Sequence, residues 1–324
     1  MSITIKDVAK KANVSASTVS RILNNLPGYS EETRQKVEKV IEELGYQPNA
    51  IARGLINRQT KIIGVLVPRV SDLFAGEILA GIEEQAQDLG YSVMICKTNN
   101  RTRDYLRTLY EKRVDGIIMV SGAINPDSYK EIEMMNVPVV VVAAQPNYPK
   151  IPSININEYQ ASYDAIKYLV EKGHSHIGMI AGTKGDDRIK GFKDALNDAG
   201  ITVTDHMITY GDYHFDSGVQ GMAELIENYP SITGVFCASD EMAVGALSCL
   251  YKHGISVPEK ISIVGFDNTS AAKKAVPPLT TVAQPLYDMG ESAIHLLLDP
   301  SSEGNKVYPH HIIERDTVRS LRRK

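Results

Sequence analysis

The sequence predicts an all-α helix-turn-helix head followed by an α/β body of two doubly wound, parallel-sheet lobes. Short amphipathic helical segments with clear start and stop residues fill residues 1–48. From residue 61 onward, apolar β-rich runs alternate with amphipathic stretches, which is typical of parallel α/β layers. The alternation begins at Ile63-Gly64-Val65 and again at Ile177-Gly178-Met179, which indicates two similar lobes with a cleft between them.

In the head, two short helices across a tight turn form the predicted helix-turn-helix. Thr4 precedes the first helix, and an acidic residue three positions later makes a variant of a capping box. Ser15 is a suitable N-cap for the second helix, Ala16–Asn24, whose apolar side chains form an inward stripe. A third helix follows the N-cap Ser30 and ends at Gly45.

The outward side chains of the second helix suit the major groove of DNA. Ala16, Ser17 and Ser20 are small, and Arg21 can donate two hydrogen bonds to guanine O6 and N7. Ala16 could contact a thymine methyl group, and Ser17 could bind a base or a phosphate. A solvated helix without a partner fits the pattern of this helix pair equally well.

The segment after the head contains a second candidate DNA contact. Tyr46-Gln47-Pro48-Asn49 is a break, with Asn49 a plausible N-cap, and Ala50–Asn57 is a short helix candidate with flanking arginines. Eight residues do not make a stable helix alone, so this piece should fold only against a partner. Apolar residues beside arginine suit a minor-groove wedge, and a flexible linker is the alternative.

The charge of the chain is uneven. Residues 1–60 carry nine Lys or Arg against six Asp or Glu, a net charge of +3, and the remainder carries −7. A basic head on an acidic body is typical of a head that binds a polyanion, although three charges also suit a solvated surface.

The residues of the head and of the next segment resemble the LacI/GalR family of bacterial transcription regulators. The resemblance rests on TIKDVAKKANVSASTVSRILNN, then GYQPNAIARGL and IIGVLVP. It implies a homodimer on double-stranded, pseudo-palindromic operator DNA, with hinge helices that order on DNA and insert Leu55 beside Ala52. The three cysteines, none in CxxC spacing, predict a reducing cytoplasm. The resemblance divides the chain into a DNA-binding domain (1–48), a hinge helix or linker (49–60) and a two-lobed effector-binding and dimerisation domain (61–324). The expected DNA-binding residues are Thr4, Ser15, Ala16, Ser17, Thr18, Ser20, Arg21, Asn24, Tyr46, Asn49, Ala52, Arg53 and Leu55.

The body reads as alternating strands and helices. The strand-like runs include Ile62–Val67, Ser92–Lys97, Gly116–Val120, Val137–Val142, Ile177–Ile180, Gly234–Cys237 and Ile261–Phe266. The helix-like stretches include Glu77–Leu89, Tyr159–Lys172, Ile189–Ala199, Ser217–Glu227 and Glu241–Lys252. The resemblance implies the architecture of periplasmic sugar-binding proteins. The basic tail from Arg315 is expected to be a frayed end rather than a second DNA site.

Polar and aromatic side chains follow the predicted strands, where ligands of open α/β sheets bind. Aromatic faces can pack on a sugar ring, and Arg188 and Asp267 can make charge-assisted bonds to hydroxyls. The residues that match the family's effector pocket are Asp72, Phe74, Arg188, Tyr213, Ser239, Asp267 and Gln284. Turn and cap residues are the alternative, and Asp240 and Asp216 fit N-caps better than ligands.

The resemblance implies a repressor of carbohydrate-utilisation genes controlled by a sugar or sugar phosphate. An apolar Ala143-Ala144, together with GDYHFDSG and GFDNT, resembles the catabolite-control branch, which a serine-phosphorylated phosphocarrier protein activates. That branch uses a basic residue in the helix after QPLYDMG, where this chain has His295, whereas Arg188 favours a small effector.

Enzyme motifs are absent from the sequence. We find no GxSxG elbow, no GxxxxGK[ST] loop and no HExxH, and therefore expect no catalytic residue, metal or cofactor. His174 and His176 fit a helix C-terminus better than a metal site. The longest apolar run, Val137–Ala144, is too short to span a bilayer. A sugar-binding or sugar-processing protein with a vestigial head remains the rival interpretation.

Overall fold

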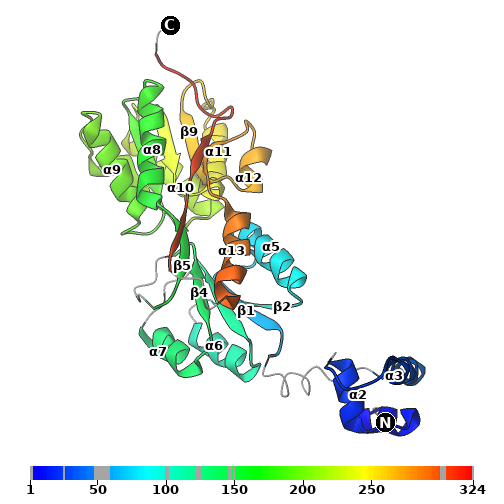
Figure 1. Ribbon diagram of the computed structural model, residues 1–324. Coiled ribbons are helices and arrows are strands. Elements are labelled where there is room, and N and C mark those ends of the chain that lie inside the picture. The colour runs from blue at the N-terminus through cyan, green and yellow to red at the C-terminus, as the bar shows by residue number, and fades with distance from the viewer. Residues whose placement is uncertain are drawn as a thin grey trace. The chain divides into compact units, whose positions relative to one another are not determined.

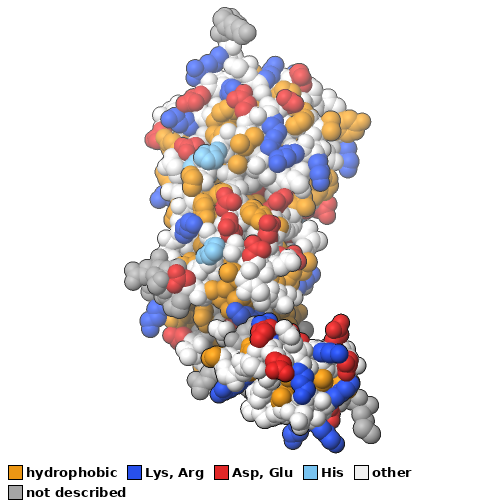
Figure 2. All heavy atoms as spheres, turned by 45° about the vertical axis from the view of Figure 1, so that its right-hand side comes forward, with side chains coloured by type: hydrophobic (Ala, Val, Ile, Leu, Met, Phe, Trp, Pro, Cys, Tyr) orange, Lys and Arg blue, Asp and Glu red, His pale blue; other side chains and the backbone are white. Residues whose placement is uncertain are grey.

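The structure, a computed structural model, describes residues 3–24, 26–46, 59–98, 102–121, 124, 126–144, 148, 150–299 and 304–322. The chain divides into two compact units. Unit 1 comprises residues 1–61 with 113–115, and unit 2 comprises residues 62–112 and 116–324 (Figure 1). On the face in Figure 2, basic and acidic side chains are interspersed over unit 2, and the head carries side chains of both signs. Within the described ranges no helix is long and apolar enough to cross a membrane.

Unit 1 contains the predicted helix-turn-helix. Its helices are α1 (Ile5–Ala12), α2 (Ala16–Leu23) and α3 (Glu31–Leu44). They enclose a small apolar core made of Val8, Ala9, Ala12, Val19, Ile22, Val37 and Val40. Helix α2 ends one residue before the predicted boundary because Asn24 is its C-cap.

The helix caps of unit 1 are those that the sequence predicts. The Asp7 carboxylate accepts hydrogen bonds from the Thr4 N–H at 2.8 Å and the Thr4 hydroxyl at 2.7 Å. The Ser15 and Ser30 hydroxyls each accept from the backbone N–H three residues later, at 3.0 and 3.2 Å. Gly45 closes α3 in the left-handed conformation, with φ of 58°. The Ser15 bond fixes the start of α2, the predicted recognition helix, and the others fix the ends of α1 and α3.

Unit 2 is built on two six-stranded sheets, counted over the residues that the structure describes. The first has the order β11-β5-β4-β3-β1-β2 and the second has the order β12-β10-β9-β8-β6-β7. The strands of the first sheet are β1 (Ile62–Val67), β2 (Ser92–Lys97), β3 (Gly116–Val120), β4 (Val139–Val142), β5 (Ser153–Ile156) and β11 (Lys306–Tyr308). Those of the second are β6 (Ile177–Ala181), β7 (Ile208–Tyr210), β8 (Gly234–Cys237), β9 (Ser262–Asp267), β10 (Thr280–Ala283) and β12 (His311–Ile313).

The two sheets have the same strand order, which confirms the prediction of two similar parallel lobes. Strand β1 pairs with β2 and β3, and β6 pairs in the same way with β7 and β8. All these pairs are parallel, and β12 alone among the described strands pairs antiparallel, with β10. Strand β4 begins two residues later than predicted, after Pro138, which has no N–H to donate to the ladder.

Helices cover the sheets of both lobes. Those of the first lobe are α5 (Leu73–Asp88), α6 (Thr102–Glu111), α7 (Pro126–Met135) and α13 (Leu286–Leu298). Those of the second are α8 (Glu158–Glu171), α9 (Asp187–Asp198), α10 (Phe215–Asn228), α11 (Asp240–Lys252) and α12 (Ser270–Lys274), with a 3₁₀ turn at Asp205–Met207. Helix α13 packs beside α5 (Figure 1), and a side chain on Gly81 or Gly290 would overlap the backbone of the other helix.

Over the residues that the structure describes, the chain passes between the lobes three times. It crosses from β5 to α8 at Asn157, from β10 to α13 at Gln284-Pro285, and from β11 to β12 at Pro309-His310. Each crossing is a short stretch between two elements, and hinges between lobes are commonly a few loop or element-terminal residues of this kind.

The C-terminal segment does not fray, so the prediction for the tail from Arg315 is wrong over the described residues. Thr317 is fully buried, and its hydroxyl donates to the Ile263 carbonyl at 2.7 Å. The Arg319 N–H donates to the Ser262 hydroxyl at 3.1 Å. The segment is therefore tied to β9 of the second sheet.

Candidate functional site

A cavity of about 580 Å³ lies in unit 2 where the carboxyl ends of strands from both sheets meet. Its lining includes Pro68 after β1, Ser121 after β3 and Asn157 after β5, all from the first sheet. From the second sheet it includes Tyr213 after β7 and Ser239 after β8. The volume is that of a small-molecule site, and the place is where the sequence predicts the ligand.

Six of the seven predicted effector residues line this cavity. They are Asp72, Phe74, Arg188, Tyr213, Ser239 and Asp267. Gln284 does not line it: this buried side chain lies behind Asp267, and its amide donates to Asp267 Oδ1 at 2.7 Å. The structure thus brings all seven positions into one neighbourhood, and their contact with an effector stays a prediction.

Arg188 is held by the protein itself. Its side chain is 8% exposed and donates to the Ala238 carbonyl at 2.7 Å and to Glu158 Oε1 at 2.9 Å. The guanidinium also lies over the Phe266 ring, 4.1 Å from its centroid. Burial alone would lower the pKa of Arg188, but the carboxylates of Glu158 and Asp267 help to hold it above its usual value.

Asp267 stands on a strained turn at the end of β9. It has φ of 109°, and Asn268 after it has φ of 61°, so two successive non-glycine residues occupy the left-handed half of backbone space. Burial raises the pKa of the Asp267 carboxyl well above its usual value, although the Arg188 guanidinium acts in the opposite direction. When it is protonated, this carboxyl group can donate a hydrogen bond as well as accept one.

Tyr213 and Ser239 are fixed by polar contacts within the second lobe. The Tyr213 hydroxyl donates to Asp186 Oδ2 at 2.9 Å, and the absence of a side chain on Gly182 leaves room for the Tyr213 ring. The Ser239 hydroxyl donates to the Tyr213 carbonyl at 2.9 Å and accepts from the Met242 N–H at 3.1 Å. Ser239 is therefore the N-cap of α11 as well as part of the cavity wall.

The prediction that Asp240 and Asp216 are N-caps is wrong. The residue that precedes each helix, Ser239 for α11 and His214 for α10, is the N-cap. Asp240 instead turns into the second lobe, where its carboxylate accepts from the Thr269 N–H at 2.7 Å and the Thr281 hydroxyl at 2.5 Å. Burial raises the pKa of Asp240 to about 6.

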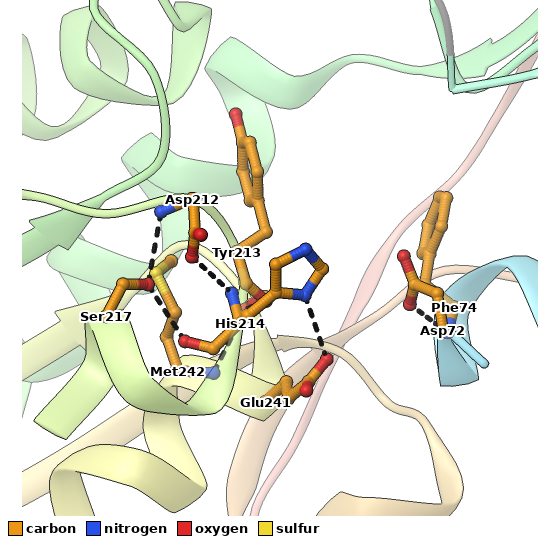
Figure 3. A network of polar contacts seen from close by, with 9 residues as sticks. Asp72, Phe74, Asp212, Tyr213, His214, Ser217, Glu241 and Met242 are labelled. Atoms are coloured by element: carbon orange, nitrogen blue, oxygen red, sulfur yellow. Dashed lines mark hydrogen bonds and ion pairs between the residues drawn. The ribbon is translucent and has the colours of Figure 1, made fainter. Parts of the chain in front are cut away.

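A second polar cluster faces Asp72 from the opposite lobe (Figure 3). His214 Nδ1 lies 3.5 Å from Glu241 Oε2, and Asp72 and Phe74 stand on the other side of the open space. Asp72 also caps α5 by accepting from the Phe74 N–H at 3.0 Å, which is why α5 begins four residues before the predicted Glu77. Sequence reasoning did not select His214 or Glu241. Glu241 follows the predicted strand Gly234–Cys237, whereas His214 follows β7, which the sequence analysis did not predict.

In the head, the predicted DNA-binding residues fall into exposed and structural positions. Ser17 and Arg21 are exposed on α2, and Arg21 Nη1 donates to the Pro27 carbonyl at 3.3 Å. Ala16 is half-buried against the head core, as is Tyr46. Thr4, Ser15 and Asn24 are cap residues, Thr18 bonds to the Ser15 hydroxyl at 2.8 Å, and Ser20 is half-buried beside Asn24. The remaining predicted residues, Asn49, Ala52, Arg53 and Leu55, lie outside the described residues.

The first histidine of the pair after α8, His174, has a structural role. His174 is buried, and its ring nitrogens pair with Thr233 Oγ1 at 3.0 Å and the Arg319 carbonyl at 3.1 Å. Burial lowers the pKa of His174. Over the described ranges, no three His, Cys, Asp or Glu side chains are grouped so that they could hold a metal ion.

Family models match both parts of the chain. The model described as bacterial regulatory proteins, lacI family, matches residues 4–49, and that of a periplasmic binding protein-like domain matches residues 166–319. Catabolite control protein A of Priestia megaterium is 39% identical over 305 residues, 92% of each chain. The repressor PurR of Vibrio atlanticus is 38% identical over 98% of this chain and 99% of its own.

Solved structures match the whole architecture. The lac repressor dimer bound to operator and the anti-inducer ONPF superposes with a TM-score of 0.89 at 28% identity, over 98% of this chain and 100% of the other. The regulator CelR in complex with cellobiose has a TM-score of 0.74 at 28% identity, over 97% and 99%. PurR and the lac repressor are repressors, and CelR is a transcriptional regulator.

Proposed function

This chain belongs to the lacI family of bacterial regulatory proteins and is a DNA-binding transcriptional regulator, and from this premise we propose that it represses carbohydrate-utilisation genes under the control of a sugar. The observation that carries the proposal is the cavity of about 580 Å³, where aromatic rings and hydrogen-bonding groups of both lobes converge. Phe74 and Tyr213 offer ring faces for a sugar, and Arg188 and Asp267 offer charged partners for hydroxyls. One solved relative is a complex with cellobiose, which supports a carbohydrate.

On the DNA side, we propose that a homodimer reads a pseudo-palindromic operator with one α2 helix in each half-site. Ser17 and Arg21 are exposed on α2, as base contacts require, and small neighbours allow close approach to the groove. We assign residues 1–48 to DNA binding, 49–60 to a hinge that orders on DNA, and 61–324 to effector binding and dimerisation. The relative bound to operator is itself a dimer, which supports this assembly.

The effector acts, on this proposal, by changing the closure of the two lobes about their three crossings. If the closed and open lobes differ in how well the two hinges pair on DNA, a ligand that prefers one state shifts operator affinity. The coupling is reciprocal, so operator DNA must change the affinity for the sugar by the same factor. Measuring both affinities on one preparation tests this equality.

The test of the function is footprinting of the purified chain on DNA upstream of its own gene, with and without sugars. We expect a protected inverted repeat, and a shift in the protein concentration needed for protection when the effector is added. A vestigial head on a sugar-processing protein would show no preference over random DNA. Protection of no inverted repeat under any sugar condition would refute the proposal.

A second candidate is a global regulator activated by a serine-phosphorylated phosphocarrier protein. The 39% identity to catabolite control protein A favours it. His295, exposed in the last turn of α13, is the basic residue that this helix offers to a phosphoserine. Titration of the chain and operator with the phosphorylated carrier, its unphosphorylated form and sugars separates the two candidates, because only this one requires the phosphate.

A further inference from the structure

We propose that the effector cavity selects against anions, so that its ligand is a polyhydroxylated compound without a phosphate or carboxylate group. The inference rests on the proposed role of the cavity in effector binding and narrows its ligand class. It removes the sugar phosphates that the sequence left open. Four features of the described cavity wall carry it: its charge, the pairing of its buried cation, its helix caps and its opposed carboxylates.

The charge of the cavity wall is strongly negative. Carboxylates outnumber guanidinium groups by six to two, and no lysine lines the wall among the described residues. The carboxylates are Asp72, Glu158, Asp187, Asp212, Glu241 and Asp267, and the guanidinium groups are Arg69 and Arg188. With every carboxyl group counted as ionised and histidine counted as neutral, the formal charge of the lining is −4, and it is −3 when the buried Asp267 is protonated. An anion that entered would meet net repulsion in a partly desolvated space.

The one buried cation of the wall is already neutralised. Two of the Arg188 nitrogens are bonded to Glu158 and to the Ala238 carbonyl, and the ring of Phe266 covers one face. Its Nε is buried and has no hydrogen-bond partner among the described residues, so the N–H groups left for a ligand belong to a guanidinium whose charge is already paired. A phosphate site normally uses an arginine whose charge is free to pair with the ligand, whereas this guanidinium is already paired with the Glu158 carboxylate at 2.9 Å.

Helix N-termini around the cavity could attract an anion, but the chain's own caps already occupy most of them. The caps of α5 and α9 are the carboxylates Asp72 and Asp186, which accept backbone N–H groups at 3.0 and 2.9 Å. Asn157 and Ser239 cap α8 and α11 in the same way, at 3.0 and 3.1 Å. At α10, the His214 side chain makes no cap bond to the helix N–H groups, and it lies instead 3.5 Å from Glu241 Oε2 of the neighbouring helix.

Asp72 and Glu241 face each other from opposite lobes across the open space (Figure 3). Burial raises the pKa of Asp72, and the Glu241 carboxylate raises it further. Because the two side chains lie on opposite lobes, closure of the lobes would bring the oxygens of Asp72 and Glu241 to the same group of a bound ligand. Hydroxyls or a protonated amine satisfy both acceptors, whereas a phosphate adds a third negative charge between them.

The experiment is calorimetric titration of the full-length chain with matched sets of ligands built on one sugar. Each set contains the neutral sugar, its 2-amino derivative and its 6-phosphate, for glucose, galactose, mannose and the glucose disaccharides. In every set that binds, we expect the neutral or amino member to bind at least tenfold more tightly than the phosphate. If the amino sugar binds more tightly than the neutral sugar, the opposed carboxylates bind an ammonium group. If the two affinities are equal, the carboxylates bind hydroxyl groups.

Substitution of the opposed carboxylates tests the cause. Asp72→Asn and Glu241→Gln should each narrow the preference for the neutral sugar over its phosphate by at least threefold. Glu259→Gln, an exposed carboxylate of the second lobe outside the cavity wall, is the matched control and should leave the preference unchanged. A phosphate that binds more tightly than its neutral parent overturns the inference and leaves the proposed function intact. If no member of any set binds, both the inference and the sugar effector are wrong.

Discussion

Replacing Asp240 with asparagine should stabilise unit 2 at neutral pH. The carboxylate is fully buried between α11, β10 and the loop after β9. It accepts from the Thr269 N–H at 2.7 Å, the Thr269 hydroxyl at 3.1 Å and the Thr281 hydroxyl at 2.5 Å. Burial outweighs these bonds and raises the pKa of Asp240 from 3.8 to about 6.

The sign of the effect follows from proton binding. Between pH 4 and 6 the folded protein binds more protons at Asp240 than the unfolded chain, so stability from this group falls as pH rises. The contribution is fully present below the unfolded value and is lost through the folded value of about 6. At pH 7, a difference of about two pKa units corresponds to about 3 kcal/mol. The asparagine side chain keeps one acceptor for Thr269 and offers a donor to Thr281, at a loss of about 1 kcal/mol in hydrogen bonding.

The expected net gain for Asp240→Asn is therefore about 2 kcal/mol at pH 7, and it should reach zero between about pH 4 and 5, where the ionisation term no longer exceeds the hydrogen-bond loss. Urea unfolding of both proteins, followed by far-ultraviolet circular dichroism from about pH 4 to pH 8, measures it. Asp205→Asn, an exposed aspartate of the same lobe, is the control and should leave the pH profile unchanged. A variant less stable than the parent at pH 7, with the same pH slope, would refute the reasoning.

Three further substitutions test the head and the cavity. Arg21→Ala should weaken operator binding by about 1–3 kcal/mol and leave random DNA unaffected in gel shifts; equal losses on both would count against base recognition. Ser15→Ala removes the cap of α2 and should lower the unfolding free energy of the head by about 1 kcal/mol, seen by thermal melting and restored by Ser15→Asp. Gly182→Ala places a methyl group where the Tyr213 ring lies and should weaken sugar binding about tenfold without changing DNA affinity, whereas unchanged calorimetry would remove Tyr213 from the binding surface.

The parts of the fold that the sequence predicts well are those decided by near neighbours. Ser15 and Ser30 cap helices through bonds that span three residues, and Gly45 ends α3 with a local backbone conformation. The strands β1, β2, β3 and β8 have the predicted bounds because apolar runs of that length, set between polar turns, have few alternatives. The repeat of the pattern at Ile177 is likewise readable along the chain.

The sequence predicted where the cavity lies in the fold but not the contacts among the residues that line it. The rule that ligands bind beyond the carboxyl ends of parallel strands located Arg188 and Asp267 near one another without any contact information. It could not reveal that Arg188 is already paired with Glu158, which is 30 residues away. It also gave Asp72 one role, as a ligand, where the structure gives it a second role as the cap of α5.

The turn that carries Asp267 shows why such detail lies beyond the reach of local pattern. Two successive residues with positive φ cost on the order of 1–3 kcal/mol each and persist only where the surroundings over-determine them. Here Arg315 donates to Asn268 Oδ1 at 2.6 Å and to the Leu279 carbonyl at 2.5 Å, while Asp240 holds the N–H of Thr269. Asp240 precedes Asp267 by 27 residues and Arg315 follows it by 48. Arg315 also belongs to the tail that the sequence analysis expected to be frayed. The orientation of Asp267 at the end of β9 is therefore set by contacts with residues distant in sequence, so the sequence predicts which residue stands there but not where its carboxyl group points.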